Sequence, residues 1–88
     1  MIVEFRQSFI RDLKRIRDRQ LVDRIKEAIE QLEQADSLTN MVSVKPIQGH
    51  EHYFRIRVGD YRLGLFLEDD TAALVRFLHR KDIYRYFP

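Results

Sequence analysis

The side chains of this chain that could do chemistry are mainly cations and aromatic rings. Three cations, Arg55, Arg57 and Arg62, fall within one apolar stretch, residues 53–66. A second group follows the last apolar run and consists of His79, Arg80, Lys81, Tyr84 and Tyr86. Guanidinium groups bind phosphate and stabilise the charge of a pentavalent transition state, histidine or tyrosine can move a proton, and aromatic rings stack on bases. These are the parts of a metal-free ribonuclease, although helix capping and packing of Tyr84 explain the second group equally well.

Other chemistries lack a motif in this sequence. There are no cysteines, which excludes disulfides and thiolate metal sites. His50 and His52 form an H-x-H pair in a polar turn without a further ligand cluster. We therefore interpret them as ordinary loop histidines and expect no metal site and no cofactor. The carboxylates of Asp69 and Asp70 are expected at the tip of a turn, and no phosphate-binding loop, dinucleotide fingerprint or G-x-S-x-G motif is present.

Residues 53–66, which must position the arginines, are predicted to form a tight β-hairpin. Gly59-Asp60 separates two runs of β-branched and aromatic residues, and a glycine in the first central position suits a two-residue type II′ turn. Such a turn fixes the facing pairs, which are Val58 with Tyr61, Arg57 with Arg62, Arg55 with Gly64, and Tyr53 with Phe66. Because side chains alternate across a strand, one face is predicted to be core, namely Phe54, Ile56, Val58, Tyr61, Leu63 and Leu65.

The opposite face of the hairpin is basic and allows two interpretations. Facing arginines destabilise a sheet by roughly 0.2 to 1 kcal/mol, but their stems can cover the sheet while the charged groups stay in water. Alternatively, the arginines form a shallow anion platform, in which the missing side chain of Gly64 lets a ligand backbone come close. The net charge is only +2, yet the basic excess lies in residues 41–88, which favours an anionic partner on this face.

Residues 1–40 are predicted to form a strand and an antiparallel helical hairpin. Met1 to Phe5 is a short apolar run, and Gln7-Ser8 offers an N-cap for the first helix. The apolar stripes are Phe9, Ile10, Leu13 and Ile16 in the first helix and Leu21, Val22, Ile25, Ala28, Ile29 and Leu32 in the second. The first helix is predicted to have a solvated face, on which basic residues are interleaved with Asp12 and Asp18. These basic residues are Arg11, Lys14, Arg15 and Arg17.

Two further segments flank the predicted hairpin. Val42 to Ile47 can extend briefly, but Pro46 bars it from a central strand. Thr71 to Leu78 is the last strand. Its register stays open, because the core face could be formed either by Leu74 and Leu78 or by Val75 and Phe77.

The tail is predicted to be a short helix, because Ile83 and Phe87 stand four residues apart. We therefore expect residues 1–88 to be one α+β domain with the order β-α-α-β-β-β-α. Its small curved antiparallel sheet would carry the N-terminal helical hairpin on one face and the basic residues on the other. No apolar run suits a signal peptide or a membrane span, so we expect a cytoplasmic protein without a membrane partner.

Two segments carry a resemblance to a known family. The sequence resembles the RelE/ParE family of type II toxins over essentially its whole length, most specifically in KPIQGHEHYFRIRVGDYRLGLF, residues 45–66, and HRKDIYRYF, residues 79–87. The resemblance implies a small toxin that a cognate antitoxin holds inactive, and whose RelE-like members enter the ribosomal A site and cut the mRNA there. In that chemistry the ribose 2′-hydroxyl attacks the adjacent phosphate without a metal, leaving a cyclic phosphate and a 5′-hydroxyl.

The resemblance also implies roles for the residues of the hairpin. Arg55 and Arg57 match the basic strand residues that grip the RNA backbone. Arg62 matches the arginine that is placed to stabilise charge at the scissile phosphate. Lys45, which opens the first of the two segments, is a further RNA-binding candidate.

The tail residues are matched less closely. Either Arg80 or Lys81 matches a basic residue after the last strand. The tyrosine expected in the tail is Tyr84 or Tyr86, of which Tyr84 is preferred because it lies one helical turn from Lys81, while Tyr86 is a candidate for binding RNA. His79 is a further candidate for proton transfer, although its strand position could equally place it against the core. No carboxylate stands out as the general base.

The family also contains a different activity. ParE-like members poison DNA gyrase and are not nucleases, so the fold alone does not decide the function. The clustered arginines favour the nuclease, since a gyrase inhibitor has no need of them beside the tail residues. A passive RNA-binding module would keep the basic face but give no cleavage products. The expected partners are therefore the antitoxin, the ribosome and mRNA.

Overall fold

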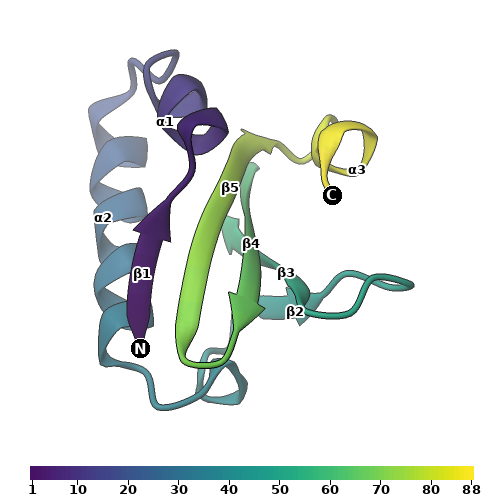
Figure 1. Cartoon of the computed structure of the whole chain (residues 1–88). Helices are drawn as coiled ribbons and strands as arrows, with labels where there is room; N and C mark the ends of the chain where they lie inside the picture. The colour runs from purple at the N-terminus through teal and green to yellow at the C-terminus, as the bar shows by residue number, and fades with distance from the viewer.

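The computed structural model describes residues 1–88 and has an α+β fold with helices on both faces of one sheet. Figure 1 shows α1 and α2 on one side of the sheet and the short α3 on the other. The elements are β1 (Ile2–Phe5), α1 (Gln7–Leu13), α2 (Arg19–Gln34), a 3₁₀ turn (Leu38–Asn40), β2 (Val44–Pro46), β3 (Tyr53–Val58), β4 (Tyr61–Glu68), β5 (Thr71–His79) and α3 (Ile83–Tyr86). The predicted fold class is confirmed, with β2 as one strand more than the predicted order contains.

The strands form a single sheet in the order β1-β5-β4-β3-β2. Strands β2 to β5 pair antiparallel, as predicted, whereas β1 pairs parallel to β5. A parallel pair needs a long connection between its strands, and the two helices together with β2, β3 and β4 supply it. The short β2 lies at an edge of the sheet, where Pro46 can be tolerated.

The main core lies between the sheet and α2. The predicted apolar stripe of α2 is buried at Ile25, Ala28 and Leu32. The helix begins after Asp18, whose carboxylate accepts a hydrogen bond from the backbone N–H of Gln20 at 2.9 Å. This cap separates α2 from α1, so the two predicted helices do not fuse.

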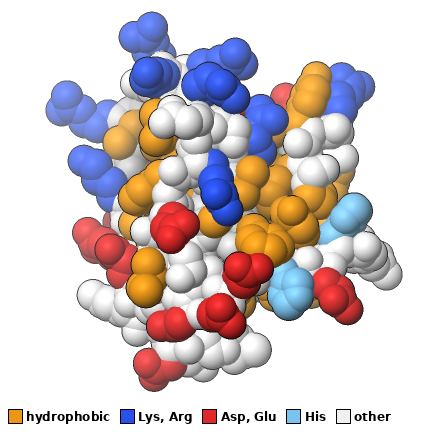
Figure 2. All heavy atoms as spheres, viewed as in Figure 1, with side chains coloured by type: hydrophobic (Ala, Val, Ile, Leu, Met, Phe, Trp, Pro, Cys, Tyr) orange, Lys and Arg blue, Asp and Glu red, His pale blue; other side chains and the backbone are white.

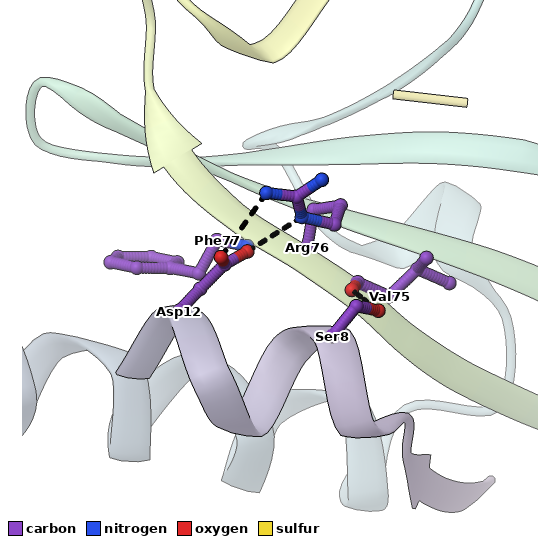
Figure 3. Close-up of polar contacts among 5 residues, drawn as sticks. All are labelled: Ser8, Asp12, Val75, Arg76 and Phe77. Carbon is purple, nitrogen blue, oxygen red and sulfur yellow. Dashed lines mark hydrogen bonds and ion pairs between the residues drawn. The ribbon is translucent and has the colours of Figure 1, made fainter. Parts of the chain in front are cut away.

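Helix α1 covers the part of the β5 edge that β1 does not reach (Figure 3). The Ser8 hydroxyl donates to the Val75 carbonyl, and the Asp12 carboxylate accepts the backbone N–H of Phe77 at 2.9 Å. Two side chains of one helix thus complete the hydrogen bonding of a strand edge. The predicted N-cap at Gln7-Ser8 is wrong, because both residues lie inside the helix and the Ser8 hydroxyl is bound to the strand. The N-cap residue is Arg6, whose side chain makes no capping hydrogen bond.

Asp12 does not lie on the solvated face of α1, where the sequence pattern placed it. It is 6% exposed, and its carboxylate pairs with Arg76, with distances of 2.8 Å from Nε to Oδ2 and 3.2 Å from Nη2 to Oδ1. Figure 3 shows the two side chains pointing toward one another from α1 and β5. The partner lies 64 residues away along the chain, so no local pattern could reveal the pair.

A β-bulge explains why the register of β5 was ambiguous. Strand β4 faces β5 with a shift between the pairs Gly64 with Arg76 and Leu65 with Leu74. Val75 therefore has no partner in β4, and the alternation of faces reverses at this point. As a result Leu74 and Phe77 both enter the main core, while Val75 and Leu78 pack on the other side of the sheet.

Helix α3 covers a smaller second core on that other side. Ile83 and Phe87 are buried there together with Ile47, which confirms that Ile83 and Phe87 anchor the tail helix. None of the helices has the length and apolar character that crossing a membrane requires.

Candidate nucleic-acid interface

The hairpin that carries the arginines has the predicted register. All the predicted facing pairs are present, namely Val58 with Tyr61, Arg57 with Arg62, Arg55 with Gly64, and Tyr53 with Phe66. Gly59 has a φ of +60°, which a type II′ turn requires in its first central position. On the basic face, Arg57 is exposed and Arg55 and Arg62 are half-buried, while Ile56, Leu63 and others fill the core on the opposite face.

A row of residues crosses the basic face of the sheet. The row consists of Lys45 in β2, Arg55 in β3, Gly64 in β4 and Arg76 in β5. Phe87 lies on this row, because a Cβ added to Gly64 would stand 2.7 Å from carbon atoms of the Phe87 ring. The prediction that Gly64 leaves room for a ligand backbone is therefore wrong, since the aromatic ring already fills that space.

The two tyrosines of α3 contact different arginines. The guanidinium of Arg55 lies 5.8 Å from the centre of the Tyr84 ring. The guanidinium of Arg76 lies 5.8 Å from the centre of the Tyr86 ring. Cations are attracted to the faces of aromatic rings at such distances. Tyr84 thus joins the arginines of the hairpin, whereas Tyr86 joins the pair of Asp12 with Arg76.

Arg62 folds back over the hairpin turn. Its Nη1 donates to the carbonyls of Gly59 at 3.0 Å and Tyr61 at 2.8 Å. Burial of its guanidinium, followed by the positive charges of Arg55 and Arg57, lowers the pKa of Arg62 from its usual value. The group stays charged at neutral pH, and the part of the pKa lowering that follows burial comes from the cations beside it.

Arg80 belongs to this cluster, and Lys81 does not. The backbone N–H of Arg80 donates to the Asp60 carbonyl at 2.8 Å, which ties the end of β5 to the hairpin turn. The charge of Arg80 also acts on Arg62, adding to the burial and the closer arginines that lower the pKa of Arg62. Lys81 is exposed and is not among the charges that shift the pKa of Arg62.

His79 lies on the opposite face of the sheet from the arginines. Its ring packs edge-on against Tyr61 with 5.4 Å between ring centres, and Tyr61 stacks on the buried Phe77 at 5.1 Å. Its Nδ1 accepts the backbone N–H of Lys81 at 3.2 Å. The structure therefore does not bring His79 to the arginine cluster.

An open hollow of about 780 Å³, here called the hairpin hollow, adjoins the basic face. The predicted RNA-contacting residues that line it are Lys45, Arg55, Arg57 and Arg62. Polar residues of α2 and the following loop also line it, namely the carboxylate of Asp36 and the amides of Gln31, Gln34 and Asn40. Amide side chains of this kind can hydrogen-bond to the edges of unpaired bases. Sequence reasoning missed them, because nothing in an exposed helix face indicates which strand it will stand beside.

Positive charge also gathers at one end of the helical layer, as Figure 2 shows. Its exposed cations, here called the helical basic surface, are Arg6, Arg11, Lys14, Arg15, Arg17 and Arg19. The carboxylates within this stretch are engaged elsewhere, since Asp12 pairs with Arg76 and Asp18 caps α2. In the same view the acidic side chains gather toward the other end of the molecule, so the protein is electrostatically polarised.

The fold and the basic face together define a class of small α+β proteins, in which an arginine-rich sheet face is completed by a short C-terminal helix. Residues 3–84 match the family described as ParE toxin of type II toxin-antitoxin system, parDE. The chain belongs to the RelE/ParE superfamily of type II toxins, as the two sequence segments had indicated.

Particular relatives lie within the same superfamily. The chain is 43% identical over 89 residues to Toxin RelE3 of Methanocaldococcus jannaschii, covering all of both chains. A chain of the RelB-RelE antitoxin-toxin complex from Methanococcus jannaschii is 41% identical and matches with a TM-score of 0.81, covering 97% of this chain and 99% of that one. YoeB from Staphylococcus aureus shares the fold at 15% identity and a TM-score of 0.75, covering 91% of this chain and 97% of that one.

Proposed function

We propose that this type II toxin is an endoribonuclease that cuts mRNA in the ribosomal A site without a metal ion. The observation that carries the proposal is the gathering of Arg55, Arg57, Arg62 and Arg80 beside Tyr84. Arginines placed side by side repel one another, and a phosphodiester backbone would relieve that repulsion. Similarity to a protein named Toxin RelE3 supports the same reading.

In the proposed mechanism, Arg62 binds the scissile phosphate. Its Nη1 is held by the carbonyls of Gly59 and Tyr61, which fixes the guanidinium plane above the turn. Its Nε and Nη2 have no acceptor within the protein. These two N–H directions can reach two oxygens of one phosphate. Hydrogen bonds that strengthen as charge develops on those oxygens lower the activation barrier.

The proposed reaction is a transesterification within the RNA. The ribose 2′-oxygen bonds to phosphorus and the bond to the 5′-oxygen breaks, which leaves a 2′,3′-cyclic phosphate and a 5′-hydroxyl. The 2′-hydroxyl releases its proton to water, and the departing 5′-oxygen takes one up. Tyr84 is the proton-carrying side chain that lies against the arginines, so we assign it the proton for the 5′-oxygen. His79 has no role in this scheme, because it lies on the other face.

The proposed partner of the toxin is a cognate antitoxin. The RelE relative with 41% identity is found in a complex with the antitoxin RelB. On the present chain, an acidic or amphipathic segment of the partner would cover the basic face or displace α3. That helix is held by a small core, in which Ile83 and Phe87 are its own buried contributions.

The ribosome as the site of action is supported by the helical basic surface. Its cations, among them Arg11, Arg15 and Arg17, are exposed and form no ion pairs within the chain. A concentrated positive surface is attracted over a long range to the phosphates of ribosomal RNA. If the helical basic surface binds ribosomal RNA, the hairpin hollow is left to bind the mRNA strand.

Inhibition of DNA gyrase is the second candidate function, because the matching family is described as the ParE toxin. A gyrase inhibitor would need its surface only for docking. It would not require a proton-carrying tyrosine beside a guanidinium with free N–H groups. The arginine cluster with Tyr84 therefore favours the nuclease.

Primer extension on a defined mRNA in a reconstituted translation reaction tests the proposal. The wild type should produce cuts at the A-site codon that depend on ribosomes, and Arg62→Ala should lose them while keeping its thermal unfolding midpoint. Lys26→Ala, which removes an exposed charge from α2, serves as the control and should cut normally. Intact mRNA under conditions in which the wild type still arrests growth would refute the nuclease and favour gyrase.

A further inference from the structure

A second hollow, here called the turn hollow, lies between α2 and the turn of the hairpin. It has a volume of about 660 Å³. Arginines from three different elements line it: Arg24 comes from α2, Arg57 and Arg62 from the hairpin, and Arg80 from the end of β5. The acidic residues of its wall are Glu27 and Asp60.

Arg24 reaches across this hollow to the hairpin turn. Its Nη1 lies 3.0 Å from the position that a Cβ on Gly59 would occupy. Although Glu27 stands three residues further along α2, neither it nor any other carboxylate forms an ion pair with Arg24, Arg57 or Arg80. Guanidinium groups that converge without a carboxylate partner form a site for an anion from outside the chain.

The turn hollow continues the hairpin hollow. Both are lined by Gln31, Ser43, Arg57 and Arg62. Strand β2 pairs with β3 only from Val44 onward, and the Ser43 carbonyl accepts the N–H of Arg57 at 3.1 Å. Beyond that point no strand pairs with the outer edge of β3, so no strand lies between the two hollows along this edge.

We propose that a single RNA strand occupies both hollows, with Arg24 binding a backbone phosphate next to the one that Arg62 binds. A single strand carries one negative charge per nucleotide, so it is held by a row of cations along a groove and not by one pocket. The row here runs from Lys45 through Arg57 and Arg62 to Arg24. Helix α2 is then a wall of the RNA-binding site as well as a support for the sheet. This inference rests on the proposed function, because it concerns the same substrate.

Binding of a short fluorescein-labelled RNA, 2′-O-methylated so that it cannot be cut, tests the role of Arg24 by fluorescence anisotropy over a range of KCl concentrations. Arg24→Ala should raise Kd about tenfold, as expected for one lost charged hydrogen bond. It should also reduce the slope of log Kd against log salt by about 0.7, the value for one phosphate contact with a single strand. Arg24→Glu should weaken binding further, and Arg24→Lys should restore most of the affinity and the slope.

Two controls separate phosphate binding from a structural role. Lys26→Ala removes an exposed charge from the same helix and should bind like the wild type. Lys26 lies about 200° from Arg24 around the helix axis. Arg24→Met keeps a long apolar side chain and loses the guanidinium that lies near Gly59, so it should bind as weakly as Arg24→Ala. All variants should unfold at the same temperature as the wild type.

Wild-type affinity in Arg24→Met or Arg24→Glu would overturn the inference, as would failure of the wild type to bind this RNA at low salt. These outcomes differ from failure of the proposed function. If all the Arg24 variants bind normally while the wild type still cuts mRNA on the ribosome, the nuclease activity is supported and the role of α2 in binding RNA is refuted. If the wild type binds RNA through Arg24 but gives no cuts, the binding site stands and the nuclease does not.

Discussion

The ring of Phe87 rests on the backbone of Gly64, so that the C-terminal segment meets the sheet at a position where any side chain would push it away. A Cβ at Gly64 would come within 2.7, 2.7 and 2.9 Å of three ring carbons of Phe87. The contact holds α3 close to the strands, and Tyr84 is carried to Arg55 by the same helix. The glycine that seemed suited to admit a ligand therefore positions a candidate catalytic residue.

Substitution of Gly64 by alanine should disturb this contact. In an ordinary strand position, Gly→Ala is neutral or stabilising. At Gly64 we expect the free energy of unfolding to fall by about 1 to 3 kcal/mol, as in other overpacked sites, and mRNA cleavage to fall with it. Urea unfolding and primer extension would measure the two effects. The double variant with Phe87→Leu should recover part of the stability, and a Gly64→Ala protein as stable as the wild type would contradict the contact.

The Asp12–Arg76 pair should make α1 essential to the edge of β5. Asp12→Ala removes the partner of Arg76 and also the acceptor of the Phe77 N–H. Because Asp12 is buried while the Arg76 side chain is 25% exposed, we expect a loss of roughly 2 to 4 kcal/mol in the free energy of unfolding. Asp12→Asn keeps an acceptor for the N–H, so it should lose less. Equal losses for both variants would show that the charge alone matters.

The fold could be predicted where its causes are local. The hairpin followed from Gly59-Asp60 and from alternation along two strands, and its register is confirmed pair by pair. The partner of Asp12 lies on a distant strand, so a carboxylate among basic residues looked like part of a solvated face. The bulge at Val75 is likewise a property of two strands together, because it depends on how β5 is placed against β4.

For the candidate site, too, the sequence predicted the residues that share one strand and not those that contacts between elements bring together. Arg55 and Arg57 share a face because they stand two residues apart in one strand. The choice between Arg80 and Lys81 needed the hydrogen bond that ties β5 to the hairpin turn. The face of His79 stayed open in the sequence, because it depends on the bulge, which reverses the face of every later residue in β5. Arg24 gave no signal at all, since its helix pattern contains only the stripe that faces the core.

The hydroxyl of Tyr84 provides the sharpest test of the proposed chemistry. Tyr84→Phe keeps the ring beside Arg55 and removes only the group that carries a proton. If that proton goes to the departing 5′-oxygen, single-turnover cleavage on the ribosome should slow by about 10² to 10⁴-fold, the usual contribution of general acid catalysis. Binding of 2′-O-methylated RNA should not change, because no cation is lost.

The same substitution at Tyr86 distinguishes the two tail tyrosines. The Tyr86 ring lies by Arg76, which pairs with Asp12, and not by Arg55 of the hairpin, so Tyr86→Phe should cut at nearly the wild-type rate. If instead Tyr86→Phe is slow and Tyr84→Phe is normal, the proton comes from Tyr86, and α3 must turn over the sheet when RNA binds. Normal rates for both variants would remove tyrosine from the mechanism and leave charge stabilisation by Arg62 as the main contribution to catalysis.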